Sequence, residues 1–406
     1  MIHLIEIENF LSIRDRQVVD LRVSGKVSDR FDRFAPIFPG ASVRAPKVIA
    51  LFGANASGKT NVLKALNFII QFVRNPAARA ISGALVERFN DEESKDRPVR
   101  IALELAGLMD ATPAVIERAG RDEAVVYGTY RYELELAVQG GQVQHVAHES
   151  LRQRPNDRGK WQRVFERSGP QQALGSKAFP IQGFRHLLTT LDPVGSIIAS
   201  FAQFQHPGAL FLKSLADSAY SFLDYQPASG DDRLIEFIGN RPDLLSTLNE
   251  DLNRIDLGIE EMRVDQTPQG WLAKFRHRKL DADMPWGLQS HGTRAFIRLY
   301  PLIAETLASG GTAIVDELDL AIHPLVLPEL IRWFHDPGRN PHGAQLWFTG
   351  QSTSLLDDLA PEEILFCEKD RQGRTGLYLA RDIARRDDNL RRKYLSGVYG
   401  AVPQIG

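Results

Sequence analysis

The eight residues Gly53–Thr60 constrain the fold of this chain more than any other stretch. They match the phosphate-binding pattern G-x-x-x-x-G-K-[ST] at every fixed position. The apolar run Val48–Phe52 that precedes them is typical of a strand buried on both faces, and apolar residues at helical spacing follow Thr60 as far as Pro76. A buried strand, a glycine loop and a helix in this order predict an α/β fold built around a nucleotide-phosphate site.

Each part of this loop has an expected role in binding ATP and Mg²⁺. The glycines let backbone N–H groups wrap around the phosphates, and the N-terminus of the following helix adds its positive dipole end. We expect Lys59 to reach the β- and γ-phosphates and the Thr60 hydroxyl to bind Mg²⁺. The expected nucleotide-binding residues of this segment are Gly53, Ala54, Asn55, Ala56, Ser57, Gly58, Lys59, Thr60 and Asn61.

An apolar strand that ends in two acids supplies the expected metal and water contacts. Thr312–Val315 is followed directly by Asp316 and Glu317. We expect Asp316 to hold Mg²⁺ through water and Glu317 to polarise the attacking water as a general base. Asp319 and His323 follow as further nucleotide-binding candidates, although a plain turn before a proline explains His323 equally well.

A serine-glycine turn begins another amphipathic helix about two dozen residues before the acidic strand. In most proteins such a Ser-x-Gly-Thr turn is simply a helix N-cap. ABC-type ATPases have their signature turn at this place, and this resemblance implies that Ser290 and the N–H of Gly292 contact the γ-phosphate bound to the other protomer, with Thr293 beside them. Because one chain cannot bring its own signature turn onto its own phosphate loop, dimerisation becomes a requirement of the mechanism.

One residue departs from the usual ABC pattern. The apolar strand Gln345–Thr349 is followed by Gly350 and Gln351, whereas ABC-type sites usually carry a histidine at the position of Gln351. Glutamine can donate a hydrogen bond but can neither carry charge nor shuttle a proton. The expected catalytic residues are therefore Glu317, Lys59 and Gln351, with slow turnover and long-lived ATP-bound dimers.

Together these motifs resemble the AAA/ABC-like ATPases of the SMC/RecF/OLD group, found in bacterial anti-phage and abortive-infection systems. The resemblance covers about half of the chain, in the segments Ile7–Asp15, Phe52–Thr60, Ile255–Ile259, Ser290–Pro324 and Tyr394–Pro403. It implies an ABC/RecF-like ATPase head with a mixed sheet, an inserted β region and a helical lobe. It also implies a separate effector such as a Toprim-type nuclease, because the roughly 55 residues after the Gln351 strand are too few for a fused nuclease domain.

The pattern along the chain suggests three units. Residues of period two over Val99–Glu149, with a turn at Gly140–Gly141, predict an antiparallel β region, and helical spacing with proline breaks follows it. Gln203 and Gln205 lie where a glutamine usually links the helical lobe to the metal. The expected units are an ATPase core of residues 1–80 and 285–406, a β insertion of residues 81–180, and a helical lobe of residues 181–284 that leads to the signature turn.

Composition limits the setting in which the protein works. The 49 basic and 51 acidic side chains give a formal charge of -2, which neither demands nor excludes a nucleic-acid partner. The single cysteine, Cys367, cannot form an internal disulfide, as expected in a reducing compartment. No apolar stretch approaches the roughly 20 residues that cross a bilayer, and the N-terminus lacks secretory features. We therefore expect a cytoplasmic protein without a membrane partner.

The sequence is compatible with four classes of function. The leading hypothesis is a homodimeric or higher even-numbered ATPase that gates or assembles a defence effector. A second is a repair-type DNA-binding ATPase of the RecF/SMC kind, with Arg385–Arg386 and Arg391–Lys393 on phosphates, although interleaved acids favour a solvated surface. A transporter subunit fits poorly, because about 230 residues separate Lys59 from Ser290. An ATP-switched scaffold without turnover is the fourth, and Gln351 keeps it open.

Overall fold

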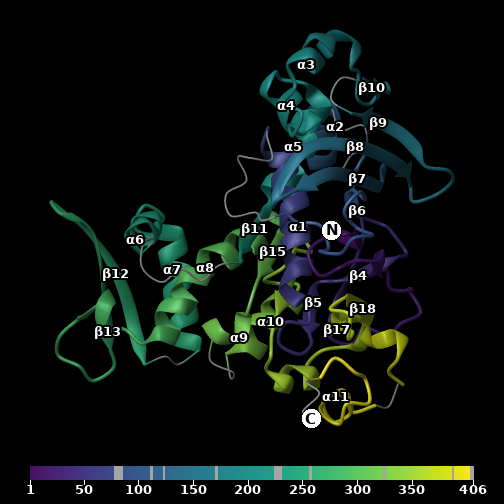
Figure 1. Cartoon of the computed structure of the whole chain (residues 1–406). Helices are drawn as coiled ribbons and strands as arrows, with labels where there is room; N and C mark the ends of the chain where they lie inside the picture. The colour runs from purple at the N-terminus through teal and green to yellow at the C-terminus, as the bar shows by residue number, and fades with distance from the viewer. Residues whose placement is uncertain are drawn as a thin grey trace.

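Helix α1 (Lys59–Arg74) lies between two β-sheets, and the other elements are arranged around this layered centre (Figure 1). The computed structural model describes residues 1–76, 86–109, 113–121, 124–169, 172–223, 231–255, 258–322, 326–385 and 388–402. One sheet is entirely antiparallel, and the other is mostly parallel with one antiparallel edge strand. These layers of helices and mixed sheet confirm the predicted α/β fold class.

The six-stranded sheet brings the phosphate-loop strand and the acidic strand to one edge. Its strand order is β11-β15-β16-β5-β17-β18. Since β5, β15 and β16 are parallel and β16 lies between the other two, their carboxyl ends meet at the same edge, where α/β sheets bind ligands. The strands are β5 (Val48–Phe52), β11 (Ala219–Phe222), β15 (Thr312–Val315), β16 (Gln345–Thr349), β17 (Ile364–Lys369) and β18 (Thr375–Leu379).

The seven-stranded sheet combines N-terminal strands with the predicted β region. Its order is β10-β9-β8-β7-β6-β1-β2, so the first two strands of the chain extend a sheet made mostly by later residues. Gly140 and Gly141, with φ of 59° and 72°, join β7 to β8 in the turn predicted there. The strands are β1 (Ile2–Glu8), β2 (Gln17–Asp20), β6 (Val99–Leu108), β7 (Tyr127–Gln139), β8 (Gln142–Pro155), β9 (Gln162–Ser168) and β10 (Gln172–Gly175).

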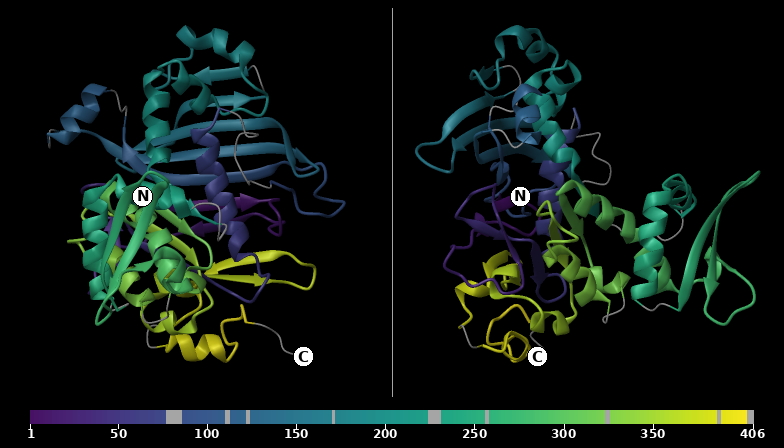
Figure 2. Two further views of the ribbon diagram at one scale, coloured as in Figure 1. Left: turned by 90° about the vertical axis from the view of Figure 1, so that its left-hand side faces the viewer. Right: turned by 180° about the vertical axis from the view of Figure 1, so that it is seen from behind.

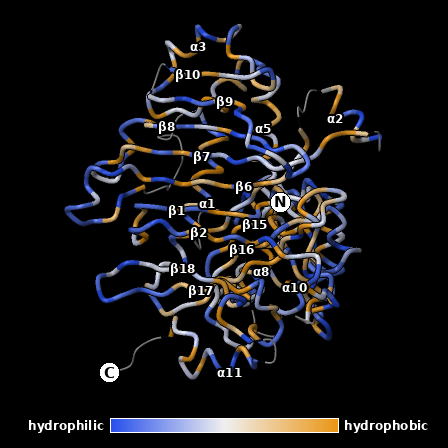
Figure 3. The backbone as a smooth tube through the Cα atoms, turned by 90° about the vertical axis from the view of Figure 1, so that its right-hand side faces the viewer, coloured by the Kyte–Doolittle hydropathy of each residue, from blue (hydrophilic) through white to orange (hydrophobic). Residues whose placement is uncertain are grey.

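Alternation along β5 divides the core into two layers. Ile49 and Leu51 pack with α1 and the seven-stranded sheet, whereas Val48, Ala50 and Phe52 pack with helices on the opposite face. Those helices are α8 (His291–Ser309) and α10 (Leu327–His335). A strand covered on both faces has no polar side, which explains its continuous apolar run. Figure 3 shows the hydrophobic segments gathered where these strands and helices meet.

The predicted helical region contains two groups of helices with the core strand β11 between them. Helices α3 (Arg185–Thr190), α4 (Ile197–Gln203) and α5 (Pro207–Asp217) pack near α1 and the large sheet. The second group forms a unit that projects from the two sheets and leads into α8 (Figure 2). It comprises α6 (Asp231–Gly239), α7 (Pro242–Arg254), β12 (Ile259–Thr267), β13 (Gly270–His277) and β14 (Met284–Pro285). The division of the chain into three domains stays a prediction.

Short elements connect these layers. They are β3 (Phe34–Pro36), β4 (Arg44–Pro46), α2 (Pro113–Gly120), α9 (Leu318–Ala321) and α11 (Leu390–Leu395), together with several turns of 3₁₀ helix. None of the helices within the described ranges has both the length and the apolar character needed to cross a membrane.

A buried glutamine joins the two sheets. The side chain of Gln345, at the start of β16, accepts a hydrogen bond from the N–H of Ile2 at 2.7 Å. Its amide group donates to the carbonyls of Ile2 and Pro46 at 2.9 and 3.0 Å. Gln345 is fully buried, so its three partners have no access to water. One side chain thus fixes the first strand of the large sheet against the smaller sheet.

We expect Gln345→Leu to lower the free energy of unfolding by about 2–4 kcal/mol, because it leaves three buried backbone groups without partners. Chemical denaturation followed by circular dichroism measures this change. The control is Gln372→Leu, at an exposed position in the β17–β18 turn, which should change the unfolding free energy by less than about 0.5 kcal/mol. Equal effects of the two substitutions would contradict the role given to Gln345.

Candidate nucleotide site

The phosphate loop lies between the end of β5 and the start of α1, as predicted. Its two glycines are fixed by close neighbours. A Cβ on Gly53 would lie 2.3 Å from the carbonyl oxygen of Cys367, and Gly58 has a φ of 103° with Thr375 at 2.3 Å from a built Cβ. Larger residues at either position would displace the loop. Burial raises the pKa of the Cys367 thiol to about 12, so this side chain stays a neutral, apolar backing for the loop.

Lys59 reaches back over the loop that precedes it. Its amino group donates hydrogen bonds to the carbonyl oxygens of Gly53 at 2.8 Å and Ala54 at 3.0 Å. Burial lowers the pKa of Lys59 from its ordinary value, while nearby Cys367 and acidic residues including Asp316 oppose this shift. Neutral carbonyl oxygens thus hold the amino group at the mouth of the loop. A phosphate oxygen, which is charged, can take their place as the acceptor.

One cavity of about 400 Å³ brings most of the predicted residues together. Two polar atoms in its wall are buried and have no hydrogen-bond partner among the described residues: Oγ of Ser57 and Oδ1 of Asp319. Such orphaned polar atoms point to a polar ligand. The predicted residues that line the cavity are Asn55, Ala56, Ser57, Gly58, Lys59, Thr60, Asn61, Glu317, Asp319 and Gln351.

The expected metal ligands already touch each other. The Thr60 hydroxyl donates to Oδ1 of Asp316 at 3.1 Å, although the two residues are 256 positions apart. Thr349, at the end of β16, donates its hydroxyl to the same carboxylate oxygen. Within the described ranges, no group of three or more His, Cys, Asp or Glu side chains could hold a metal ion. A hydroxyl, a carboxylate and phosphate oxygens suit Mg²⁺, so these residues fit the predicted ion.

Glu317 has an unusual backbone that Thr349 stabilises. Its φ and ψ are 51° and 46°, the left-handed conformation, which costs a non-glycine residue about 1–3 kcal/mol. The N–H of Glu317 donates to the Thr349 hydroxyl at 2.7 Å, and its side chain is exposed beside the phosphate loop. Thr349 therefore holds the predicted metal ligand and the predicted base in one arrangement. No sequence motif marks Thr349, although its place between an apolar strand and Gln351 is a signal that could have found it.

Asp319 organises the loop that contains Gln351. Its Oδ2 atom accepts hydrogen bonds from the backbone N–H groups of Gln351 and Ser352, both at 2.5 Å. The Gln351 side chain is exposed in the wall of the cavity. Asp319 thus acts on the backbone around Gln351, while its other oxygen is buried without a hydrogen-bond partner in the described part of the chain. Its expected role as a nucleotide contact stays a prediction.

The serine-glycine turn lies outside this cavity. Ser290 caps α8: its hydroxyl oxygen accepts from the N–H of Thr293 at 3.1 Å. Ser290 and Gly292 are exposed, and a Cβ built on Gly292 meets nothing within 4 Å. Neither residue, nor Thr293, lines the phosphate cavity of its own chain. The ordinary N-cap is present, and an open surface surrounds it.

Other residues singled out in the sequence lie elsewhere. His323 falls outside the described residues. Gln203 and Gln205 are exposed and do not line the cavity. In the C-terminal basic segment, Arg391 pairs with Asp357 at 3.0 Å and Lys393 pairs with Asp388, while Arg386 is outside the described ranges. These pairs agree with the solvated surface that the interleaved acids indicate.

A second cavity of about 820 Å³ adjoins the first, and both are lined by Ser57 and Lys369. Its walls come from the segment around Asp15 and from the β17–β18 hairpin, including Arg374. Ser12 and Thr375 hold this wall to the phosphate loop: their hydroxyls lie 2.7 Å apart, and Thr375 donates to the carbonyl of Ser57 at 2.9 Å. Lys369 and Thr375 are further site residues that were not predicted from the sequence, since no spacing rule marks them.

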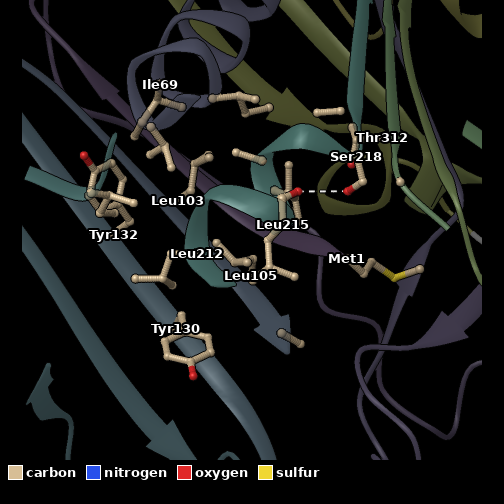
Figure 4. A pocket seen from close by; sticks show the side chains of 18 of the residues that line it. Met1, Ile69, Leu103, Leu105, Tyr130, Tyr132, Leu212, Leu215, Ser218 and Thr312 are labelled. Carbon is tan, nitrogen blue, oxygen red and sulfur yellow. Dashed lines mark hydrogen bonds between the residues drawn. The ribbon is translucent and has the colours of Figure 1, made fainter. Parts of the chain in front are cut away.

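An apolar cavity of about 220 Å³ lies beside α5 and the far half of α1 (Figure 4). It is lined by residues such as Ile69, Leu103 and Leu215, and it contains none of the phosphate-loop residues. Its polar side chains are few, and that of Ser218 is bonded to the carbonyl of Leu215 at 2.8 Å. None of its lining side chains is charged, so it lacks the cations that the phosphates of a nucleotide require.

The chain matches a known protein family. The family model described as "AAA domain, putative AbiEii toxin, Type IV TA system" matches residues 48–109 and 185–357. These ranges hold the phosphate loop, the Ser290 turn, the acidic pair and Gln351, whereas residues 110–184, with most of the large sheet, lie outside the match. In a comparison with curated proteins, none matches the chain.

The chain is also similar to a solved structure, the SMC head domain from Thermotoga maritima, at 12% sequence identity and a TM-score of 0.42. The similarity covers 93% of this chain and 98% of that one. The resemblance to AAA/ABC-like ATPases drawn from the motifs is confirmed by the family match. Because that match spans more than half of the chain, this protein belongs to the family described as AAA domain, putative AbiEii toxin, Type IV TA system.

Proposed function

We propose that this protein is a cytoplasmic ATPase that binds ATP with Mg²⁺ at the phosphate loop and hydrolyses it slowly as a head-to-head homodimer or higher even oligomer. The observation that carries this proposal is the contact between Thr60, Asp316 and Thr349 at the mouth of the loop. Three segments far apart in the sequence converge there on one carboxylate. An arrangement of this kind serves to hold a metal beside phosphates.

The two adjoining cavities suit different parts of the nucleotide. The smaller one, with Lys59 and the loop N–H groups, suits the triphosphate, and the larger one, with Asp15, Gln17 and Tyr378, suits the nucleoside. Lys369 lines both and supplies a positive charge at their junction. When the phosphates bind, the Lys59 amino group exchanges the carbonyls of Gly53 and Ala54 for phosphate oxygens. This exchange favours the charged ligand over the free loop.

The chemistry then follows from where the acids lie. Mg²⁺, held by Thr60 and Asp316, would neutralise charge on the β- and γ-phosphates. Glu317 has an exposed carboxylate beside the same cavity, where it can take a proton from water. Thr349 keeps the backbone of Glu317 in the conformation that places the Glu317 side chain there. Gln351 contributes a hydrogen bond but no charge, so proton transfer rests on Glu317 alone.

Dimerisation supplies the groups that one chain lacks. In a single chain the phosphate cavity is lined on the loop side and the acidic side, while Ser290 and Gly292 are exposed elsewhere. Two chains placed head to head would bring the start of α8 of one over the phosphate loop of the other, where its N–H groups favour negative charge. Bound ATP then joins the two protomers, because each ATP contacts both of them.

The family suggests a wider role for this ATPase. Its description names a putative toxin of a type IV toxin–antitoxin system, and the motifs resemble ATPases of anti-phage systems. We propose that ATP-dependent pairing gates a separate effector, such as a Toprim-type nuclease. An ATP-switched scaffold without turnover is the second candidate, favoured by Gln351 at the histidine position.

The main test combines phosphate release with analytical ultracentrifugation. We expect Lys59→Ala to weaken ATP binding by about 10- to 100-fold, through loss of a charged hydrogen bond. Glu317→Gln should bind ATP, dimerise and lose about two to four decades of rate. Ser290→Arg should bind ATP yet stay monomeric, while Ser290→Thr, which keeps the capping hydroxyl, should pair normally. A Ser290→Arg monomer that hydrolyses ATP at the wild-type rate would disprove the shared site.

Thr349→Val should lower kcat by about 10- to 100-fold with ATP affinity within about threefold of wild type. The reason is that two hydrogen bonds, each contributing about 0.5–1.5 kcal/mol, hold Asp316 and Glu317 in place. Thr349→Ser keeps the hydroxyl and should retain most of the rate. Single-turnover hydrolysis and nucleotide titration separate the two effects, and a Val variant with unchanged kcat would contradict the positioning role.

The identity of residue 351 should determine the turnover rate of ATP hydrolysis. We expect wild-type turnover below about 1 s⁻¹, at the low end of enzymes, with a further fall in Gln351→Ala. Gln351→His should raise the rate by about tenfold or more, because imidazole can transfer a proton. Steady-state assays measure all three. Fast turnover that Gln351→Ala leaves unchanged would overturn the expectation, and no turnover in any variant would favour the scaffold.

A further inference from the structure

The hairpin between β8 and β9 concentrates positive charge in a nearly neutral protein. Residues 152–163 contain four arginines and one lysine but only one acid, Asp157, while the whole chain has a formal charge of -2. We call Arg152, Arg154, Arg158, Lys160 and Arg163 the basic hairpin. This segment lies within residues 110–184, outside the family match, so the nucleotide-site assignment does not account for it.

Its arginines lie opposite one another across neighbouring strands. In the register of the large sheet, Arg131 on β7 faces Arg152 on β8, and Arg152 faces Arg163 on β9. Like charges directly opposite one another destabilise a sheet. Arg131 is neutralised by buried acids, including Glu6 at 2.9 Å and Glu104 at 3.1 Å. On β8 and β9, Arg154 pairs with Asp157 and the buried Arg167 pairs with Glu149. Neither acid pairs with Arg152 or Arg163 among the described residues.

The outer charges face solvent. Arg152, Arg158 and Lys160 are exposed and form no ion pair with any described residue, and Arg163 has only Glu166 at 4.0 Å. On the opposite face of the same strands, Leu151 and Phe165 are buried in the core, so the register fixes the arginines outward. A polyanionic partner reduces the repulsion between such charges. We therefore expect a sheet that holds them together on its surface to be stabilised when it binds one.

We propose that the basic hairpin binds the phosphodiester backbone of a double-stranded nucleic acid. A duplex presents about one negative charge per 1.7 Å of axis, which matches several cations held together on one hairpin. Binding to single strands relies on free aromatic rings that stack with bases. The ring of Trp161 is covered by the Arg154 guanidinium at 4.6 Å, so this surface favours backbone contacts.

The surroundings distinguish this surface from one that binds lipid. A membrane-surface site needs large apolar side chains beside its cations. Among the described residues, no large apolar side chain that is highly exposed lies between positions 150 and 168. The hairpin belongs to the large sheet, which α1 separates from the six-stranded sheet of the phosphate loop (Figure 1). Binding there should therefore occur without nucleotide and should survive in Lys59→Ala.

The test is fluorescence anisotropy of a labelled 30-base-pair DNA duplex, an RNA duplex of the same sequence and the single strands, across a salt series. We expect Arg152→Gln/Arg163→Gln to weaken duplex binding by about 10-fold or more and to reduce the slope of log Kd against log salt by about 2, one for each lost phosphate contact. The control Lys95→Gln/Arg121→Gln removes two exposed charges that already pair with Glu92 and Glu117, and it should bind like wild type.

The arms of the experiment distinguish the possible partners. The duplex that binds more tightly, RNA or DNA, identifies the kind of nucleic acid that the hairpin prefers. Arg158→Gln/Lys160→Gln, in the turn beyond the paired strands, should weaken binding without any effect on sheet pairing, which guards against misfolding of the first variant. Duplex affinity that is unchanged in both double variants would overturn the proposal. So would wild-type binding to phosphatidylserine vesicles or polyglutamate but not to duplexes.

Discussion

The burial of α1 between two sheets is the constraint on which the other features depend. A helix with apolar residues on both faces can lie only where both faces are covered, and here one sheet covers each. Its N-terminus is then fixed at the carboxyl edge of the six-stranded sheet. Lys59 and Thr60 are the first residues of that helix. The position of the phosphate site is thus a consequence of core packing.

Polar contacts at this edge convert a packed core into an ordered site. The hydroxyls of Thr60 and Thr349 donate to Asp316, and the N–H of Glu317 donates to Thr349. The loop N–H groups of Gln351 and Ser352 donate to Asp319. These bonds connect the ends of three parallel strands. Each bond is modest in net energy, but together they leave few alternative arrangements for the acids. Preorganisation of this kind lowers the cost of arranging charges during a reaction. The left-handed backbone of Glu317 is tolerated because its neighbours determine it.

Charge is distributed unevenly over a molecule whose total is nearly zero. On the inner strands of the large sheet, the buried carboxylates of Glu6 and Glu104 pair with Arg131. Further out, the same sheet carries arginines whose neighbours are arginines. Net charge hides this difference, because it sums over surfaces that face different partners.

Much of the nucleotide site could be predicted from the sequence, because its residues lie in short local patterns. Gly53–Thr60 and Asp316–Glu317 were identified by spacing within a strand, a loop and a helix start, and the structure places them in and beside one cavity. Lys369 and Thr375 could not be identified, because no local pattern marks them, and Thr375 bonds to Ser57, 318 residues away. Thr349 follows an apolar strand, which is a local signal, but its bonds to Asp316 and Glu317 depend on how two strands pair. The same holds for the hairpin arginines, whose opposition depends on strand register.

What the sequence by itself determined is the set of local elements and the chemistry of the phosphate loop, because glycine freedom, helix periodicity and apolar runs act over a few residues. Only the tertiary structure decided that β16 lies between β5 and β15, and that Gln345 bonds to Ile2 and Pro46. It also decided that Arg152 lies opposite Arg163. These are long-range choices, fixed by how whole faces pack, and no single segment contains the information for them.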